Sequence, residues 1–267
     1  LLIGRYNCTV FTAVIDVLIT DYLLVSAFGP QGNDQAIQAL YGQVTHPLST
    51  ATSITAGMRH ARVDNAINNN GAAVDIDDDV TVGSLGFVHR PNADWRLFLR
   101  ADQNYRFAKV DEHTNVPSGQ PVGLNTQRGA SYETGASFTQ AGISASFNAY
   151  YLRLEDEISF DASSFFNINL PRTRRRGITT ALDFDVSQTV TAGVSYAYVD
   201  SEITSGPFRG NEVPLVPSQR ATAYLSYRPY AGVQTRLDVQ HVDEQFLGGD
   251  FDNSSAPLDA YSVVNLA

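Results

Sequence analysis

The chain has 267 residues and a formal net charge of −10, with 43% hydrophobic and only 17% charged residues. This acidic balance argues against a nucleic-acid partner, because phosphate binding requires surfaces rich in lysine and arginine. The single cysteine, Cys8, excludes an internal disulfide and a cysteine-based metal site. Lys109 is the only lysine, so arginine carries nearly all of the positive charge.

Residues 8–28 form an apolar run, CTVFTAVIDVLITDYLLVSAF. A transmembrane helix here would bury Asp16 and Asp21, at a cost of about 2.5–3.5 kcal/mol each near the bilayer centre. A signal peptide is a second alternative, with Arg5 before the run, but the same two acids interrupt its apolar core. The β-branched content favours one or two strands. We treat residues 1–36 as a separate, ill-defined N-terminal segment.

In residues 37–267, hydrophobic residues recur at every second position, which is the period of a β-strand. Short connections such as PNAD and SQT alternate with long ones such as NAINNNGAAVDIDDD and DASSFFNINLPRT. In an antiparallel meander all the long connections lie at one end of the sheet, and long loops are usually functional. The expected strands are 37–46, 53–64, 80–90, 95–107, 131–140, 143–160, 174–186, 190–200, 220–229, 233–246 and 260–267.

The two faces of each expected strand differ in polarity. Leu182 and Val194 belong to the apolar faces of two successive strands. The strand at 95–107 shows the clearest contrast: its apolar face begins with Trp95, and its other face carries four charged residues, Arg96, Arg100, Asp102 and Arg106. The polar face could therefore face water around the protein or water inside it.

Two architectures are compatible with this alternation. A soluble β-sandwich turns its apolar faces inward. A transmembrane β-barrel turns them to lipid, with segments of about ten residues that span a bilayer and aromatic residues at their ends. Trp95, Tyr105 and Tyr227 lie at such ends. We therefore predict an all-β fold, an antiparallel meander of about 11–13 strands that forms part of an outer-membrane barrel.

Several segments resemble the C-terminal barrel of TonB-dependent receptors. The resemblance covers roughly residues 95–267, although Asn125-Thr126 replaces the family's usual Pro-Glu. The segments are WRLFLRADQNYRFAKVDE (95–112), GLNTQRGASYETGASF (123–138), TRRRGITTALDF (173–184), GNEVPLVPSQRATAYLSYRP (210–229) and FLGGDFDNSSAPLDAYSVVNLA (246–267).

The resemblance implies a receptor in the outer membrane of a Gram-negative bacterium, embedded in lipid, that takes up a ferric siderophore or a similar metal chelate with energy from TonB. No segment resembles the family's plug domain or TonB box, so we expect both to be absent from this chain and the chain to be a fragment that cannot transport alone. A passive porin-like channel, a soluble β-rich binding protein and an outer-membrane hydrolase are the alternatives.

The candidate ligand-binding residues are charged side chains on the predicted lumen face or in the long loops. The row Arg96, Arg100, Asp102 and Arg106 could attract an anionic ligand or form salt bridges within the lumen wall. Arg174 lies near a strand start, where lipid phosphate groups or ligand could be contacted. Arg209 lies in a long loop.

Catalytic and metal sites have no candidates in the sequence. The five histidines lack ligand spacing, and neither Asp75 to Asp79 nor Asp250 and Asp252 has the spacing of a calcium loop. No nucleophile elbow, phosphate-binding glycine loop or Cys–His pair is present. We expect no enzymatic activity and no cofactor.

Overall fold

The structure, a computed structural model, describes residues 10–26, 29–69, 72–113 and 123–267. These residues form a single twelve-stranded sheet with strand order β1 to β12. The strands are β1 Val10–Ser26, β2 Gly29–Pro47, β3 Thr52–Asn69, β4 Ala72–His89, β5 Trp95–Arg106, β6 Gln127–Gln140, β7 Ile143–Asp161, β8 Phe166–Asp185, β9 Val190–Ile203, β10 Gln219–Tyr230, β11 Val233–Val242 and β12 Tyr261–Leu266.

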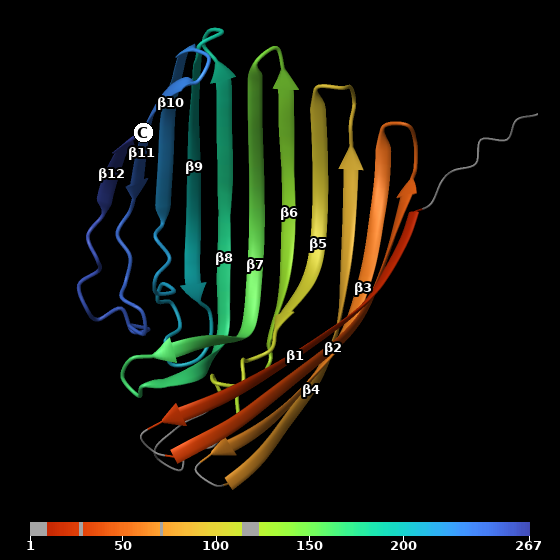
Figure 1. The fold of residues 1–267 in the computed structure, drawn as a ribbon, viewed down its shortest axis with the longest axis vertical. Coiled ribbons are helices and arrows are strands. Elements are labelled where there is room, and N and C mark those ends of the chain that lie inside the picture. Colours follow the sequence, from red (N-terminus) through yellow and green to blue (C-terminus); the bar gives the residue numbers. More distant parts are fainter. Residues whose placement is uncertain (1–9, 27–28, 70–71, 114–122) are drawn as a thin grey trace, which may run out of the picture.

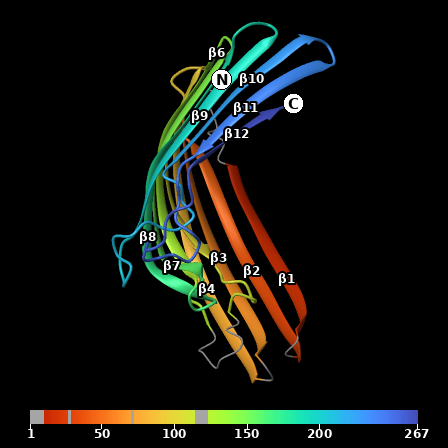
Figure 2. The ribbon, with the colours of Figure 1, turned by 90° about the vertical axis from the view of Figure 1, so that its left-hand side faces the viewer.

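Each strand pairs antiparallel with the next, so the predicted all-β meander is confirmed (Figure 1). The sheet is strongly curved, and within the described residues β1 and β12 are its two edges (Figure 2). The sheet is therefore not closed, as expected of part of a barrel. Among the described residues no helix is long and apolar enough to cross a membrane.

The N-terminal apolar run forms a strand rather than a helix. β1 pairs with β2 over a continuous register from Val10↔Thr45 to Ser26↔Gly29. The expected boundary at residue 36 falls inside β2. Cys8 and Arg5 lie outside the described residues.

Two of the connections expected to be long are mostly strand, and this prediction was wrong. β3 and β4 remain paired from Asn69↔Ala72 onward, and the β7–β8 ladder extends to Asp161↔Phe166. The hydrophobic alternation stops before the hydrogen-bonded ladder does, because strands that leave an apolar environment need no apolar face. The connections that remain long are 107–126, 204–218 and 243–260, all at one end of the sheet.

One face of the sheet, which we call the apolar face, is lined by exposed hydrophobic side chains. The register places Leu182 opposite Val194, Val194 opposite Ala223, and Ala223 opposite Val239. Large side chains on this face are extensively exposed, for example Leu40, Met58, Leu99, Phe147, Leu182, Val194, Leu225 and Val239. A soluble protein rarely exposes so continuous an apolar surface. We call the opposite face the polar face.

Candidate ligand-binding site on the polar face

The predicted row of charged residues on β5 lies on the polar face. Arg100 and Asp102 form an ion pair with a distance of 2.5 Å between Nε and Oδ2. The guanidinium of Arg96 lies 5.0 Å from the centroid of the Phe98 ring, within the range of a cation–π contact. The structure thus brings Arg100 and Asp102 together and leaves the Arg100 side chain 59% exposed. Arg100 is the charge of this row most accessible to a ligand.

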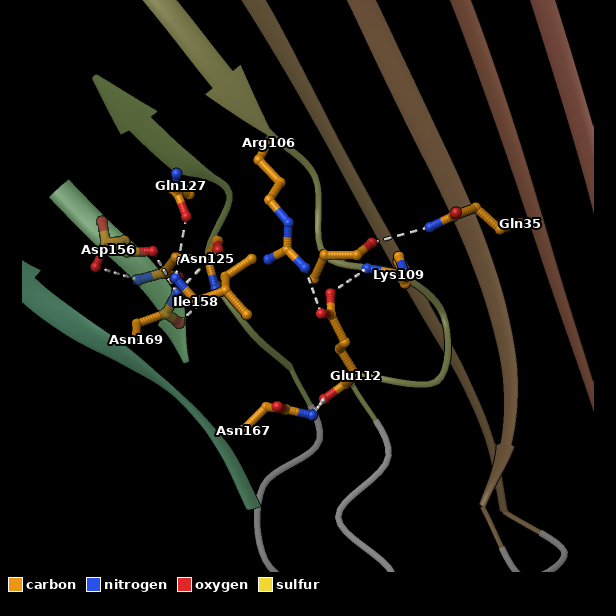
Figure 3. Close-up of polar contacts among 11 residues, drawn as sticks. Gln35, Arg106, Lys109, Glu112, Asn125, Gln127, Asp156, Ile158, Asn167 and Asn169 are labelled. Carbon is orange, nitrogen blue, oxygen red and sulfur yellow. Dashed lines mark hydrogen bonds and ion pairs between the residues drawn. The ribbon is translucent and has the colours of Figure 1, made fainter. Parts of the chain in front are cut away.

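Arg106, at the end of the same strand, anchors the connection that follows it. Its guanidinium is ion-paired with Glu112, and the other carboxylate oxygen of Glu112 accepts a hydrogen bond of 2.8 Å from the backbone N–H of Lys109 (Figure 3). Nη1 of Arg106 is buried and has no hydrogen-bond partner among the described residues. Arg106 therefore stabilises the first arm of the loop, at the cost of one buried donor for which the described residues provide no partner.

This first arm, residues 107–113, folds against the polar face of β2–β4. Phe107 packs with Ala39, Ala61, Val63 and Val80 in one hydrophobic cluster. The amide nitrogen of Gln35 donates to the backbone oxygen of Ala108 at 2.9 Å. The arm thus covers an apolar patch on an otherwise polar wall, and Val110 of the arm is fully buried.

The second arm, residues 123–126, and the first residue of β6 are held by β7 and β8. The backbone N–H of Asn125 donates to Oδ1 of Asn169 at 2.9 Å, and Nδ2 of Asn169 donates back to the backbone oxygen of Asn125 at 3.1 Å. Oε1 of Gln127 accepts a hydrogen bond from the backbone N–H of Ile158 (Figure 3). Both arms are therefore fixed by specific side chains of neighbouring strands.

His113 connects the two arms. Its Nδ1 accepts a hydrogen bond of 3.1 Å from the backbone N–H of Leu124. The side chain is buried, and this burial lowers the pKa of His113, against a smaller opposing effect of Glu112. The neutral imidazole, with its proton on Nε2, fits this acceptor role.

The other two predicted residues do not join this group. Arg174 lies on the same face as Ile178 and pairs with Asp200 at 3.6 Å and with Glu202. Arg209 is exposed in the connection 204–218. The six predicted residues are thus divided between the polar face, the apolar face and a loop.

A buried charge on the polar face was missed from the sequence. Arg175 forms a bidentate pair with Glu157 at 2.7 and 3.0 Å, and both side chains are only 16% exposed. The alternation that puts Asp183 on the polar face also puts Arg175 there, so this residue was predictable. Glu157 was not, because the backbone turns at Asp156, whose φ is +54°.

A further polar cluster lies nearer the short turns. The Tyr224 hydroxyl donates to Asp183 at 2.7 Å, and the Arg236 guanidinium lies 3.9 Å from the centre of the Tyr224 ring. Arg236 is also paired with Asp238 at 2.9 Å. The cluster crosses from β8 to β11 along the polar face, which makes this part of the wall charged.

Within the described ranges, no group of three or more His, Cys, Asp and Glu side chains could hold a metal ion. The polar face therefore offers guanidinium groups, carboxylates and amides. Such a surface can bind an anionic solute or a complementary protein surface.

Comparisons with known proteins agree with this architecture. Residues 9–267 match the sequence profile of the family described as TonB dependent receptor-like, beta-barrel. The match begins well before residue 95, where the motifs that carry the resemblance start. No curated protein sequence matches the chain.

Three solved structures illustrate the structural similarity. The ferric yersiniabactin uptake receptor FyuA from Yersinia pestis has a TM-score of 0.75 at 18% identity, covering 100% of this chain and 44% of that chain. The copper transporter OprC has a TM-score of 0.82 at 14% identity, covering 98% and 45%. BauA, the ferric preacinetobactin receptor from Acinetobacter baumannii, has a TM-score of 0.73 at 13% identity, covering 97% and 43%. The chain thus spans less than half the length of these proteins.

Proposed function

The chain belongs to the TonB-dependent receptor family, and from this premise we propose that it forms part of an outer-membrane barrel for TonB-energised nutrient uptake. Members of this family are receptors and transporters, and their barrels lie in the outer membrane of Gram-negative bacteria. The observation that carries the proposal is the family match over residues 9–267 of a sheet with one apolar and one polar face. In this proposal the apolar face contacts lipid and the polar face lines the lumen.

The proposed cargo is a ferric siderophore or a similar metal chelate. FyuA and BauA are described as receptors for ferric chelates and OprC as a copper transporter, which supports a metal-containing cargo. Many metal chelates are anionic, and fixed guanidinium groups in a water-filled lumen attract anions. We assign the first contacts to Arg96, Arg100 and Arg209, and a supporting role to Asp102 and Arg106.

The proposal also assigns partners. The polar face would form the wall against which a plug domain packs, and TonB would contact the plug rather than these strands. The charged cluster around Tyr224 and Arg236 is suited to this, because opposite charges across an interface fix its orientation.

One observation favours a second candidate, a passive channel. The arm 107–113 folds against the lumen side of β2–β4, as a constriction loop would. Transport measurements separate the two functions. We expect uptake of a labelled ferric chelate by cells carrying the full-length protein to stop when TonB is deleted. Uptake that continues at the same rate without TonB would establish a passive channel instead.

The ligand contact can be tested at Arg100. We expect Arg100→Gln to weaken binding of anionic ferric chelates to the full-length receptor about tenfold, measured by equilibrium binding. Arg176→Gln is the matched control, because Arg176 lies at the loop end of the opposite face, paired with Asp200 at 2.7 Å. Equal affinities of the wild type and Arg100→Gln would remove Arg100 from the ligand site.

A further inference from the structure

The apolar face is not uniformly covered by large side chains. Between β4 and β7 it is hollowed by a groove whose floor consists of small residues, Ala101, Thr134, Ala136 and Ala149. Large side chains border the groove, among them Leu85, Phe87, Leu99 and Phe147. Two adjoining hollows of about 610 and 720 Å³ share Phe87, Leu99 and Thr134, so the groove is continuous along the strands.

The groove changes character at its loop end. Tyr132 and Tyr151, with ring centroids 6.5 Å apart, line the 610 Å³ hollow and also a third hollow of about 320 Å³ directly beyond it. The third hollow is bordered by Arg128, Arg153 and Glu155, with Gly129 and Ala130 between them. The apolar groove therefore leads past two tyrosines into this third hollow, which we call the charged cup, on the same face.

The charges of this cup favour an anion. Arg153 and Arg172 both contact Glu155, at 2.6 and 3.1 Å, while Arg128 lies 3.5 Å from Asp78. Three guanidinium groups thus share two carboxylates. Arg128 also donates to the backbone oxygen of Asp79 at 3.2 Å, yet the side chains of Arg128 and Arg153 remain 53% and 47% exposed and so accessible to a ligand.

The dimensions match a lipid that lies upright in one leaflet. Thr134 and Arg128 are six residues apart on β6, which is about 20 Å along the strand at about 3.4 Å per residue and about 14 Å along the bilayer normal for a strand tilted by about 45°. Half of the hydrocarbon core of a bilayer is about 15 Å thick. With its headgroup at Arg128 and Arg153, a chain in the groove would therefore pass the two tyrosines and reach the middle of the bilayer near Thr134.

We propose that this groove is a binding site for one anionic phosphate-bearing lipid, with an acyl chain over Thr134, Ala136 and Ala149 and its phosphate between Arg128 and Arg153. The proposal rests on the membrane location given under the proposed function. Arginine is suited to the headgroup because its guanidinium binds phosphate oxygens through two parallel hydrogen bonds.

Native mass spectrometry of the full-length protein, extracted in mild detergent, tests the site. The probes are phosphatidylglycerol, which is anionic, and phosphatidylcholine, which is zwitterionic, with inorganic phosphate as a third addition. We expect the wild type to retain one phosphatidylglycerol with about tenfold preference over phosphatidylcholine, and we expect inorganic phosphate not to displace it. Displacement by inorganic phosphate would show a free anion site and overturn the proposal.

Three variants localise the binding. In the double variant Arg128→Gln and Arg153→Gln, we expect the preference for phosphatidylglycerol to fall to about one. Ala149→Phe fills the floor of the groove and should reduce binding of both lipids. Arg176→Gln removes a charge elsewhere on the same rim and should change neither. An unchanged preference in the double variant, or an equal loss in Arg176→Gln, would overturn the proposal.

The outcome is separable from that of the proposed function. Recovery of the protein in the outer-membrane fraction, as a band whose mobility changes on heating, reports membrane insertion alone. A protein that inserts but shows no lipid preference refutes the groove and leaves the receptor function standing. A protein that does not insert refutes the location on which both depend.

Discussion

The two ends of the strands follow different rules. At the short turns, strands begin and end almost where the hydrophobic alternation does: β7 begins at Ile143, β9 at Val190 and β11 at Val233, each at its predicted residue. At the other end, β2 begins at Gly29 rather than 37 and β4 at Ala72 rather than 80. The comparison shows that the hydrophobic alternation reflects the environment of a strand, whereas the length of the strand is set by its backbone hydrogen bonds.

The largest expected effect concerns the part of the strands near the short turns, where the strand boundaries match the hydrophobic alternation. Leu182→Arg or Val194→Arg would place a charge on the apolar face, and each should destabilise the folded protein by about 2–4 kcal/mol at mid-depth in lipid. Equilibrium unfolding of the full-length protein in lipid vesicles measures this. Thr179→Arg, on the polar face of the same strand as Leu182, is the control and should change the free energy of unfolding little. Equal losses from Thr179→Arg and Leu182→Arg would mean that the faces are assigned wrongly.

A smaller effect is expected from packing on the polar face. Gly135 lies beneath the Phe98 ring, and a Cβ added there would be 2.6 Å from that ring and 2.5 Å from the backbone oxygen of Phe147. Gly135→Ala should therefore destabilise the protein by about 1–3 kcal/mol, since the backbone oxygen cannot move aside. Gly83→Ala is a matched control, because its added Cβ would be 3.6 Å from the nearest atom. Equal unfolding free energies of the two variants would contradict this packing.

The third prediction concerns the end where loops replace strands. Arg106→Gln removes the charge that fixes Glu112. The free energy needed to open the arm 107–113 should therefore fall by about 1–3 kcal/mol, and the arm should open more often than in the wild type. Lys109 lies in this arm, and cleavage after it by a lysine-specific protease measures the opening. We expect the cleavage rate to rise about tenfold or more. Arg100→Gln, on the same strand, should leave it unchanged; a similar increase there would indicate general destabilisation.

The smallest expected effect is the pH response of the same arm. Because burial lowers the pKa of His113, neutral His113 contributes stability fully above its unfolded pKa of about 6.5, and this stability is lost as the pH falls towards the lowered folded value. Cleavage after Lys109 should therefore be faster at pH 5 than at pH 7.5. His113→Gln, which retains an acceptor, should remove most of this difference. A pH response that persists in His113→Gln must come from another group.

Much of the fold could be predicted from the sequence because a two-residue period on a half-buried sheet is a strong signal. The meander, the faces of Leu182 and Val194, and the placement of Arg100 and Asp102 all follow from it. The loop site could not be predicted in the same way. The contacts of Arg106 with Glu112 and of Asn125 with Asn169 depend on where irregular backbone turns, and hydrophobic periodicity carries no information about that.

Arg174 shows what the alternation predicts and what proximity to a loop does not. Its position in the alternation was sufficient to place it beside Ile178 rather than beside Arg175. Its proximity to a strand start suggested a contact with lipid phosphate groups or ligand, which stays a prediction, and the structure pairs it with Asp200 and Glu202. Alternation thus decides on which face such a residue lies, whereas proximity to a loop does not.

The ladder between β4 and β5 has a mechanical consequence. It comprises six residue pairs, Ser84↔Asp102 to His89↔Leu97, whereas β3 and β4 share eighteen and β5 and β6 share twelve. The ladder of β11 with the edge strand β12 also has six pairs, so β4–β5 is the shortest ladder between interior strands of the described sheet. Under a load that pulls the wall apart, this interior seam should yield first. The first four strands would then rotate together about the six pairs near the short turns. The hydrogen bond between Gln35 and Ala108 would restrain this rotation at the loop end. The wall would then widen along one seam while the longer ladders on either side of it stay intact.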